Sequence, residues 1–192
     1  TAEPRAGADD DRVVIRKVLD LRDRRGLINL VVRRLRDVRR NEFRDALDVD
    51  GRAGTNDGTI RPNQIFALGA LGESLVDPER TRAALAVVER DLLTPMGLRT
   101  LARTEPGYQP LYRGGVRDRD AAYHQGTTWP WLLGAFVEAW LRLRGSTIEA
   151  KAEAKERFLP PLVAELGRAG LGHISEVFDG DAPHAPGGCP FQ

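Results

Sequence analysis

The sequence predicts an all-α fold, and three observations lead to that prediction. Apolar residues recur every three to four positions over several long segments, which is the spacing of amphipathic helices. Alternation with a period of two lasts no more than a few residues, so a Rossmann sheet or a barrel is not expected. The connections alternate between short and long, as in a stack of helical hairpins with one end elaborated for function.

The first part of the chain is expected to contain two helices. Two amphipathic segments lie between Asp11 and Arg40 and are separated near Gly26. Polar, turn-forming stretches elsewhere indicate long loops, which should gather at the functional end of the stack. These loops are expected over residues 44–62, 94–126 and 170–192.

Four further helices are predicted, over residues 63–76, 79–93, 127–143 and 147–168. The first of them is expected to end at Val76, because Asp77 precedes a proline and such a residue avoids the α region. Thr127 or Thr128 is the expected N-cap of the third helix. The fourth is expected to bend at Pro160.

The composition is that of a soluble globular protein, with 41% hydrophobic and 30% charged residues among 192. No apolar stretch approaches the ~20 residues of a membrane span, and no leader opens the chain. We therefore expect a cytoplasmic protein without a membrane partner. The single Cys189 cannot form an internal disulfide and has no metal-ligand spacing with histidine, so a free buried thiol is expected and no metal or organic cofactor.

The charge is unevenly distributed along the chain. Residues 1–40 hold twelve basic and seven acidic residues, a net +5, whereas the whole chain has a net charge of +1. A basic amphipathic segment can bind nucleic acid or an anionic membrane. The simpler interpretation is a solvated helix face, and we expect no nucleic-acid partner.

The segment before the third of these helices contains the side chains of a sugar-binding site. Tyr123, His124, Gln125, Trp129 and Trp131 lie within nine residues. The flat apolar faces of pyranose rings stack on aromatic side chains, while amide and imidazole groups bind the hydroxyls. The alternative is that the two tryptophans are core anchors. Trp131 falls on the apolar side of the helix and is expected in the core, whereas Trp129 is left open.

Glu176 is the candidate catalytic carboxylate. It lies between Ile174 and the pair Val177-Phe178, and a carboxylate in apolar surroundings normally has a function or a partner. A surface position in an amphipathic turn is the alternative. The Gly-x-Ser-x-Gly, Walker and His-Glu-x-x-His motifs are absent from the sequence, which leaves a carboxylate-dependent hydrolase.

Four segments carry a family resemblance: residues 61–68 (RPNQIFAL), 93–101 (LTPMGLRTL), 120–131 (DAAYHQGTTWPW) and 172–176 (GHISE). In sequence, order and separation they resemble the C-terminal amylo-α-1,6-glucosidase domain of bacterial and archaeal glycogen debranching enzymes. The likeness covers about residues 43–192, and residues 1–42 form a separate basic segment without it.

The resemblance implies an (α/α)6 toroid that hydrolyses α-1,6-linked glucose at the branch points of glycogen or a related α-glucan. Hydrolysis would proceed with inversion, with Glu176 as the general base and an aspartate N-terminal to the matched region as the acid. Residues in or near the matched segments are the candidates for substrate binding. They are Trp129, His124, Gln125, Tyr123, Asp120, Arg61, Asn63, Gln64, His173 and Asp179.

We expect the toroid to be incomplete in this chain, as in a truncated gene product that lacks the acid. An incomplete toroid would leave apolar helix faces partly exposed, such as those of Ile65, Leu68, Leu132 and Phe136. Two other functions stay open, a noncatalytic carbohydrate-binding remnant and another toroidal glucosidase of trehalase type. The oligomeric state is not predicted.

Overall fold

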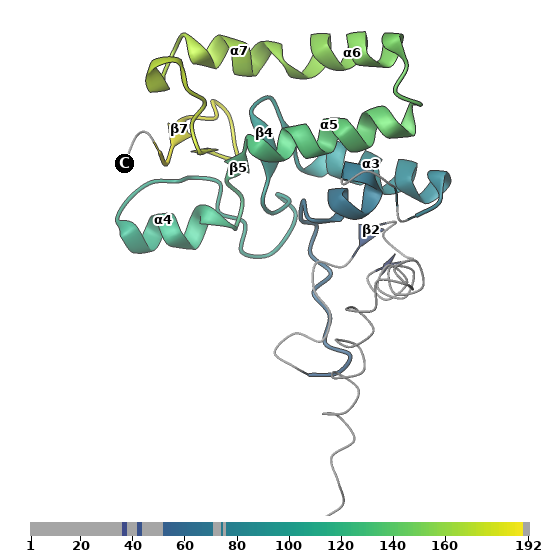
Figure 1. Cartoon of the computed structure of the whole chain (residues 1–192). Helices are drawn as coiled ribbons and strands as arrows, with labels where there is room; N and C mark the ends of the chain where they lie inside the picture. Colours follow the sequence, from purple (N-terminus) through teal and green to yellow (C-terminus); the bar gives the residue numbers. More distant parts are fainter. Residues whose placement is uncertain (1–35, 38–41, 44–51, 71–73, 75, 190–192) are drawn as a thin grey trace, which may run out of the picture.

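The structure is a computed structural model that describes residues 36–37, 42–43, 52–70, 74 and 76–189 (Figure 1). Most of the two helices expected between residues 11 and 40 lies outside these ranges. Strand β1 (Arg36–Asp37) falls inside that segment and pairs antiparallel with β2 (Glu42–Phe43). These two residues of the expected helix are therefore extended.

The helices expected after residue 78 are confirmed. They are α3 (Pro78–Asp91), α5 (Trp131–Leu143), α6 (Ile148–Phe158) and α7 (Pro160–Leu166). In Figure 1, α6 and α7 run along the top, with α5 below them and α3 below α5. The break between α6 and α7 falls at Pro160, as predicted, because proline has no N–H to donate to the preceding turn.

Two helix starts are fixed by side-chain caps. The Asp77 carboxylate accepts a hydrogen bond from the backbone N–H of Arg80, and Pro78 occupies the first helical position of α3. The Thr147 hydroxyl accepts one from the N–H of Ala150 at the start of α6. Each cap satisfies a donor that the first helical turn leaves without a partner, a contribution of about 1 kcal/mol.

The core lies between α5 and the helices on either side. The Phe158 ring of α6 meets Phe136 and Trp140 of α5 edge-on, at centroid distances of 5.7 and 5.5 Å. Burying such a side chain contributes about 1.5–3 kcal/mol. The apolar positions that we expected to be partly exposed are instead buried: Ile65 (0% exposed), Leu68 (0%), Leu132 (3%) and Phe136 (0%).

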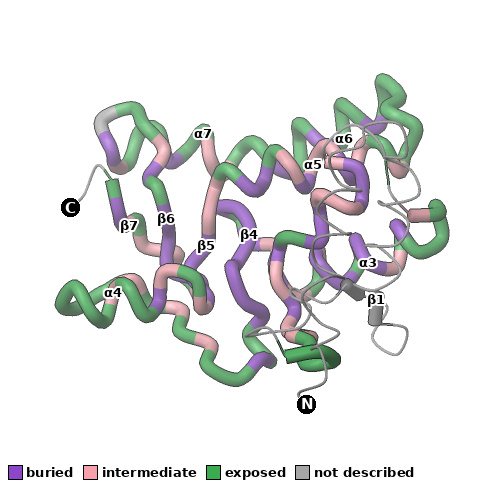
Figure 2. The backbone as a smooth tube through the Cα atoms, turned by 60° about the horizontal axis from the view of Figure 1, so that its bottom comes forward, coloured by how far each residue is buried: buried purple, intermediate pink, exposed green. Residues whose placement is uncertain are grey.

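The all-α prediction is wrong in one respect, because the helix-rich fold contains a small antiparallel sheet. Its strands follow one another in the order β3-β4-β5-β6-β7. They are β3 (Leu93–Thr94), β4 (Gly97–Arg99), β5 (Thr128–Trp129), β6 (Val177–Phe178) and β7 (Pro186–Gly187). Strands of two or three residues are too short to show alternation, and all of β4 and β6 is buried (Figure 2).

The sheet also changes the start of α5. Thr128 pairs with Phe178 in the sheet and does not cap the helix, which begins after Pro130. The residues expected to form a helix over 63–76 form a shorter one that includes a π-helical turn over Phe66–Ala70. Gly69 has a φ of 118°, which residues with a side chain rarely adopt, and it interrupts helical geometry there.

The long loop over residues 94–126 contains an unexpected helix, α4 (Val116–Tyr123), whose residues are mostly exposed (Figure 2). Across the described ranges, no helix is long and apolar enough to cross a membrane. The Cys189 thiol is free but exposed, and not buried as expected.

Candidate active site

The small sheet brings two of the predicted functional segments together. Within it, Trp129 pairs with Leu98 and Thr128 pairs with Phe178. Glu176 lies immediately before β6, and Trp129 ends β5. The sheet that the sequence did not reveal is therefore what places Glu176 beside the aromatic segment.

Both carboxylate oxygens of Glu176 accept hydrogen bonds. The hydroxyl of Tyr123 donates to Oε1, and the backbone N–H of Cys189 donates to Oε2 at 2.9 Å. The N–H of Glu176 in turn donates to the carbonyl of Cys189 at 2.9 Å. Gly188 also bounds the carboxylate, since a Cβ at that position would lie 2.6 Å from Oε2. The carboxylate is thus oriented from two sides while its residue is exposed to solvent.

These hydrogen bonds determine the protonation state of the pair. The Tyr123 hydroxyl, and after it the Cys189 N–H, stabilise the carboxylate and lower the pKa of Glu176 below its ordinary value. The same bond raises the pKa of Tyr123 to about 12, because ionised tyrosine would repel the carboxylate. At neutral pH, Glu176 is ionised and Tyr123 is a neutral donor. Glu176 can therefore accept a proton from a bound water but is poorly suited to donate one.

Three predicted residues form an aromatic cluster next to Glu176. The rings of Tyr123, His124 and Trp129 contact one another, and the centroids of each pair are 4.9 Å apart. Trp129 donates from its indole N–H to the carbonyl of Tyr123 at 3.1 Å, which fixes its ring. Tyr112, which the sequence did not single out, extends the cluster at 5.7 Å from Tyr123.

A pocket of about 330 Å³ opens beside this cluster. Its lining combines predicted site residues with neighbours from α5 and the loops: Arg61, Pro62, Asn63, Thr100, His124, Trp129, Trp131 and Leu132. Trp131 is 59% exposed, so its expected place in the core is wrong. Trp131 is the first residue of α5, and the buried face of this helix begins one position later, at Leu132.

Arg61 and Gln125 connect the loops of the site. The Arg61 guanidinium donates to the carbonyls of Thr100 and His124 at 3.1 and 2.7 Å, and to Oε1 of Gln125 at 3.0 Å. These bonds hold the residue 61 segment against the segment that carries the aromatic cluster. Arg61 itself lines the pocket, and Gln125 helps to hold its guanidinium in place.

Two other predicted residues have structural partners. Asp179 is buried, and its carboxylate accepts from the N–H of Tyr112 at 2.8 Å and from Arg113 at 2.6 Å. Gln64 is buried and donates to the carbonyl of Arg61 at 3.1 Å. The oxygen of this amide has no hydrogen-bond partner within the described ranges.

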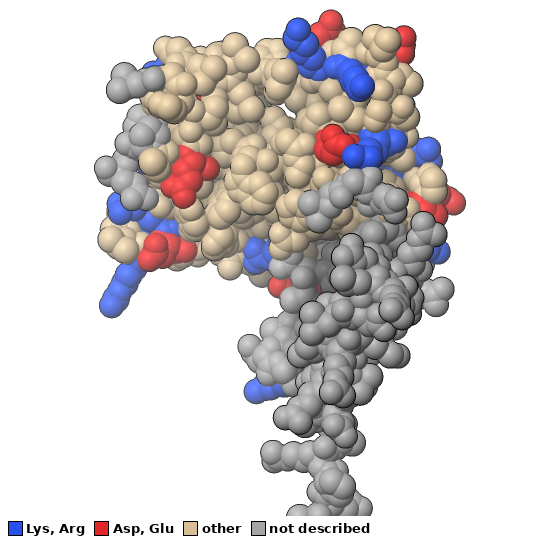
Figure 3. Space-filling model, viewed as in Figure 1, with Lys and Arg blue, Asp and Glu red and all other residues tan. Residues whose placement is uncertain are grey.

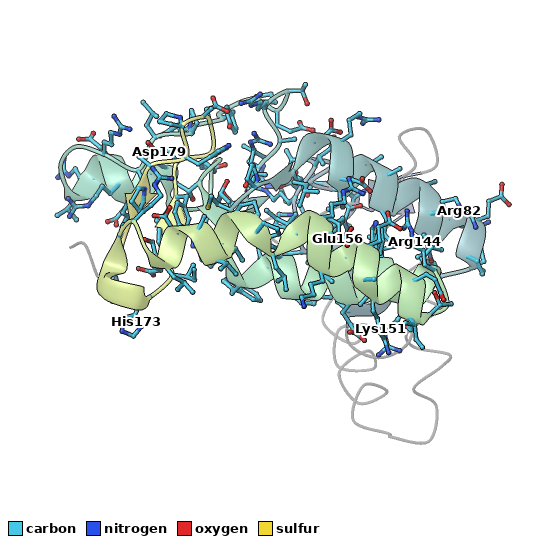
Figure 4. The ribbon with its side chains drawn as sticks, turned by 90° about the horizontal axis from the view of Figure 1, so that it is seen from above. Arg82, Arg144, Lys151, Glu156, His173 and Asp179 are labelled. Atoms are coloured by element: carbon cyan, nitrogen blue, oxygen red, sulfur yellow. The ribbon has the colours of Figure 1, made fainter. Side chains whose placement is uncertain are left out.

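The remaining predicted residues lie at the edges. Asn63 is exposed at the rim of the pocket. Asp120 is exposed on α4. His173 follows the short helical turn after α7, and Figure 4 shows it projecting from the molecule, away from Asp179. The structure therefore unites Tyr123, His124, Trp129 and Glu176 and leaves His173 apart.

A second polar network, which the sequence did not indicate, attaches the segment that follows Glu176. The Asp181 carboxylate accepts from the hydroxyl of Tyr108 at 2.9 Å and from Arg103 at 2.6 Å. The buried Arg99 donates to the carbonyl of Gly180 at 2.8 Å. Asp181 has a lowered pKa, because the hydrogen bonds from Tyr108 and Arg103 and the nearby positive charges outweigh its partial burial, so its carboxylate is ionised at neutral pH.

The surface charge is unevenly distributed on one face of the molecule. Figure 3 shows a broad uncharged area between separate groups of charged side chains. Among the described residues, no group of three or more His, Cys, Asp or Glu could hold a metal ion. The site contains aromatic rings and one ionised carboxylate. It also contains hydroxyl, imidazole and amide groups.

We compared the sequence with families of known proteins and with individual proteins. The family model described as amylo-alpha-1,6-glucosidase matches residues 25–192. The chain belongs to the amylo-α-1,6-glucosidase family. Its match with the glycogen debranching enzyme of Saccharomyces cerevisiae is 32% identical over 130 residues and covers 64% of this chain. That match covers 8% of the yeast enzyme's length.

The family match contains the whole aromatic cluster, the pocket and Glu176. It begins at residue 25, inside the N-terminal segment 1–42 for which the motifs gave no likeness. Membership of the amylo-α-1,6-glucosidase family supports a glycosidase-type function.

Proposed function

We propose that this member of the amylo-α-1,6-glucosidase family acts in the hydrolysis of α-1,6-linked glucose at the branch points of glycogen or a related α-glucan. Glu176 is the general base, and Tyr123, His124 and Trp129 form the adjoining sugar-binding surface. The observation that carries the proposal is the ionised Glu176 carboxylate, held by Tyr123 and Cys189 beside a cluster of exposed and half-buried rings. The protein would work in the cytoplasm, in glycogen breakdown.

The reaction follows from the roles that the groups can take. Glu176 accepts a proton from a water, and the oxygen of that water forms a bond to C1 of the terminal glucose. The bond between C1 and O6 of the branch point breaks, and O6 takes a proton from a general acid. Attack from the face opposite the leaving oxygen inverts the configuration at C1.

An inverting enzyme needs its second carboxyl ~6.5–9.5 Å from the base, so that the water fits between base and sugar. The family resemblance implies that this acid is an aspartate N-terminal to the matched motifs. It also implies an (α/α)6 toroid with the site at one end. In that arrangement, the loops around residues 94–126 and 170–189 would form one side of the funnel.

A Glu176→Gln variant tests the catalytic part of the proposal. It is made in the full-length natural protein that contains these residues, and glucose release from a branched limit dextrin is followed. Removal of a positioned base typically lowers kcat 10²–10⁴-fold, whereas the amide retains the shape and most of the binding. Glu153→Gln on α6 is a matched control, because it removes an exposed carboxylate on a helix remote from the aromatic cluster. If Glu176→Gln retained more than about a tenth of the normal kcat, Glu176 would not be the base.

A noncatalytic glucan-binding function is the second candidate, because the motifs supply only one of the two carboxylic acids that hydrolysis requires. Electrophoresis through a gel that contains glycogen distinguishes the two functions. A binding protein is retarded and releases no glucose from the limit dextrin. A hydrolase releases glucose, and the Glu176→Gln variant stays retarded while its glucose release falls.

A further inference from the structure

We propose that Trp131, backed by Phe66, is a second sugar-stacking platform that binds an α-1,4-linked glucan chain outside the cleavage site. The inference rests on the proposed function, because it takes Glu176 to mark the point of cleavage. It adds a chain-binding subsite and predicts which substrates benefit from it.

The exposure of Trp131 is the first observation. Its side chain is 59% exposed, although an indole is among the side chains that gain most from burial. The other large hydrophobic side chains exposed within the described ranges are all aliphatic: Leu111, Val116, Ile148, Leu159, Val163 and Leu166. Among the Phe, Tyr and Trp rings whose burial the structure describes, Trp131 is the exposed one, and it lines the same pocket as His124 and Trp129.

The backing of the ring is the second observation. Phe66 stacks against Trp131 with centroids 6.2 Å apart and an interplanar angle of 23°. Trp131 is also the first residue of α5, so its backbone is held by the helix. A ring that is fixed before the ligand arrives loses little conformational entropy on binding.

The position of Trp131 relative to Glu176 is the third observation. Outward from Glu176, the rings follow in the order Tyr123, Trp129 and Trp131, with centroid steps of 4.9 and 6.3 Å. Trp129 and Trp131 are inclined by 55°. Two sugars stacked on them would be turned relative to each other, as successive glucoses are in the curved α-1,4-linked chain.

Polar groups around the platform suit sugar hydroxyls. Asn63 and His124 are exposed and line the same pocket as Trp131. The guanidinium of Arg61 is held by protein carbonyls and by Gln125, so it shapes the wall. A neutral, hydroxyl-rich chain fits this combination better than a charged ligand.

Binding measurements on the full chain test the platform without reference to turnover. The Glu176→Gln background prevents hydrolysis, and affinity is measured by calorimetry with maltoheptaose and with isomaltose. Trp131→Ala should weaken maltoheptaose binding at least about fivefold, as expected for an aromatic anchor. The affinity of the same variant for isomaltose should change less than about twofold, because this ligand has only two glucoses and does not reach Trp131. Trp131→Phe should restore most of the affinity for the longer ligand.

Leu166→Ala is the control, since it removes an exposed apolar side chain from α7, outside the pocket. Circular dichroism checks that each variant is folded. Equal maltoheptaose affinity with and without Trp131 overturns the inference, as does equal loss for both ligands or no binding to the parent chain. Loss of self-association in sedimentation, with unchanged sugar affinity, would identify Trp131 as a protein contact instead. Failure of the hydrolysis proposal is recognised separately, by glucose release that does not depend on Glu176.

Discussion

The hydroxyl of Tyr123 is the residue-scale feature with the clearest chemical consequence. It binds Glu176 directly and is the largest contribution to the lowered pKa of that carboxyl. Sequence placed Tyr123 among the sugar-binding residues, and the structure assigns its hydroxyl a partner within the protein. Its ring still faces Trp129 and His124, so the residue joins the carboxylate to the sugar-binding surface.

Tyr123→Phe should therefore change the pH dependence of the reaction. Without the hydroxyl, the pKa of Glu176 rises toward its ordinary value. A general base works only when ionised, so activity would be lost at a higher pH as the solution is acidified. The acidic limb of the kcat/KM profile should move to higher pH, with KM at neutral pH little changed.

Tyr112→Phe is the matched control for this profile. It removes the same hydroxyl from a ring 5.7 Å from Tyr123 that forms no hydrogen bond to Glu176 in the described part of the chain. The acidic limb of the kcat/KM profile of Tyr112→Phe should stay at the same pH as in the parent protein. An unshifted limb in Tyr123→Phe would show that the hydroxyl does not hold the carboxylate.

The sequence predicted which residues contribute to the candidate site, but it did not predict the side chains and backbone groups that they contact. Tyr123, His124, Trp129 and Glu176 come together in space. Asp179 carries a carboxylate that could bind a ligand. In the structure, however, this carboxylate accepts hydrogen bonds from Arg113 and from the N–H of Tyr112. Arg113 lies more than sixty positions from Asp179 in the sequence, so the spacing of residues could not predict this contact.

At the scale of elements, close contact between backbones attaches the Glu176 segment to the loop before α5. A Cβ at Gly180 would lie 2.1 Å from the carbonyl oxygen of Gly126, which is far inside van der Waals contact. Gly126 itself has a φ of +143°, and a Cβ there would meet the Tyr108 ring at 2.7 Å. Both positions therefore require glycine.

Gly180→Ala should destabilise the fold by about 1–3 kcal/mol, the usual cost of overpacking, because the added methyl group meets backbone. Urea denaturation would measure the loss. Gly134→Ala is the control, since Gly134 lies in α5 with open space around it and alanine favours helix by about 1 kcal/mol. A Gly180→Ala variant as stable as the parent would mean that the two loops are not in contact.

The elements that sequence predicted were those with a strong local signal. α3 and α6 carry caps and helical spacing, and the break at Pro160 follows from proline chemistry. The sheet was missed because its strands have two or three residues and pair across distant segments. Thr128 could equally have been a cap or a strand residue, and tertiary pairing with Phe178 decides for the strand.

At the scale of the whole molecule, the exposed apolar surface lies on the outer helices and not on the core face of α5. Ile148 is 81% exposed and Val163 is 61% exposed, with Leu159 at 46% nearby in sequence. Leu159 and Val163 are four positions apart in sequence, and exposed apolar side chains that gather on one surface promote association.

A double variant, Leu159→Ser with Val163→Ser, should bind less hydrophobic dye and self-associate less than the parent chain. Its free energy of unfolding should stay within ~0.5 kcal/mol, as for surface substitutions. Dye fluorescence and sedimentation would measure both effects. A monomeric parent chain with a sharp thermal transition and no dye binding would contradict the prediction.

In the proposed reaction, Glu176 acts as the base on the face of the sugar opposite the leaving oxygen. The most direct measurement uses Glu176→Ala in the full-length natural protein, with azide added to a branched limit dextrin. Azide can enter the space left by the carboxylate and form a bond to C1 as the bond to O6 breaks. We expect little cleavage without azide and restored cleavage with it, yielding the β-glucosyl azide of inverted configuration. Cleavage by Glu176→Ala at near-normal rate without azide, or a product of retained configuration, would contradict it.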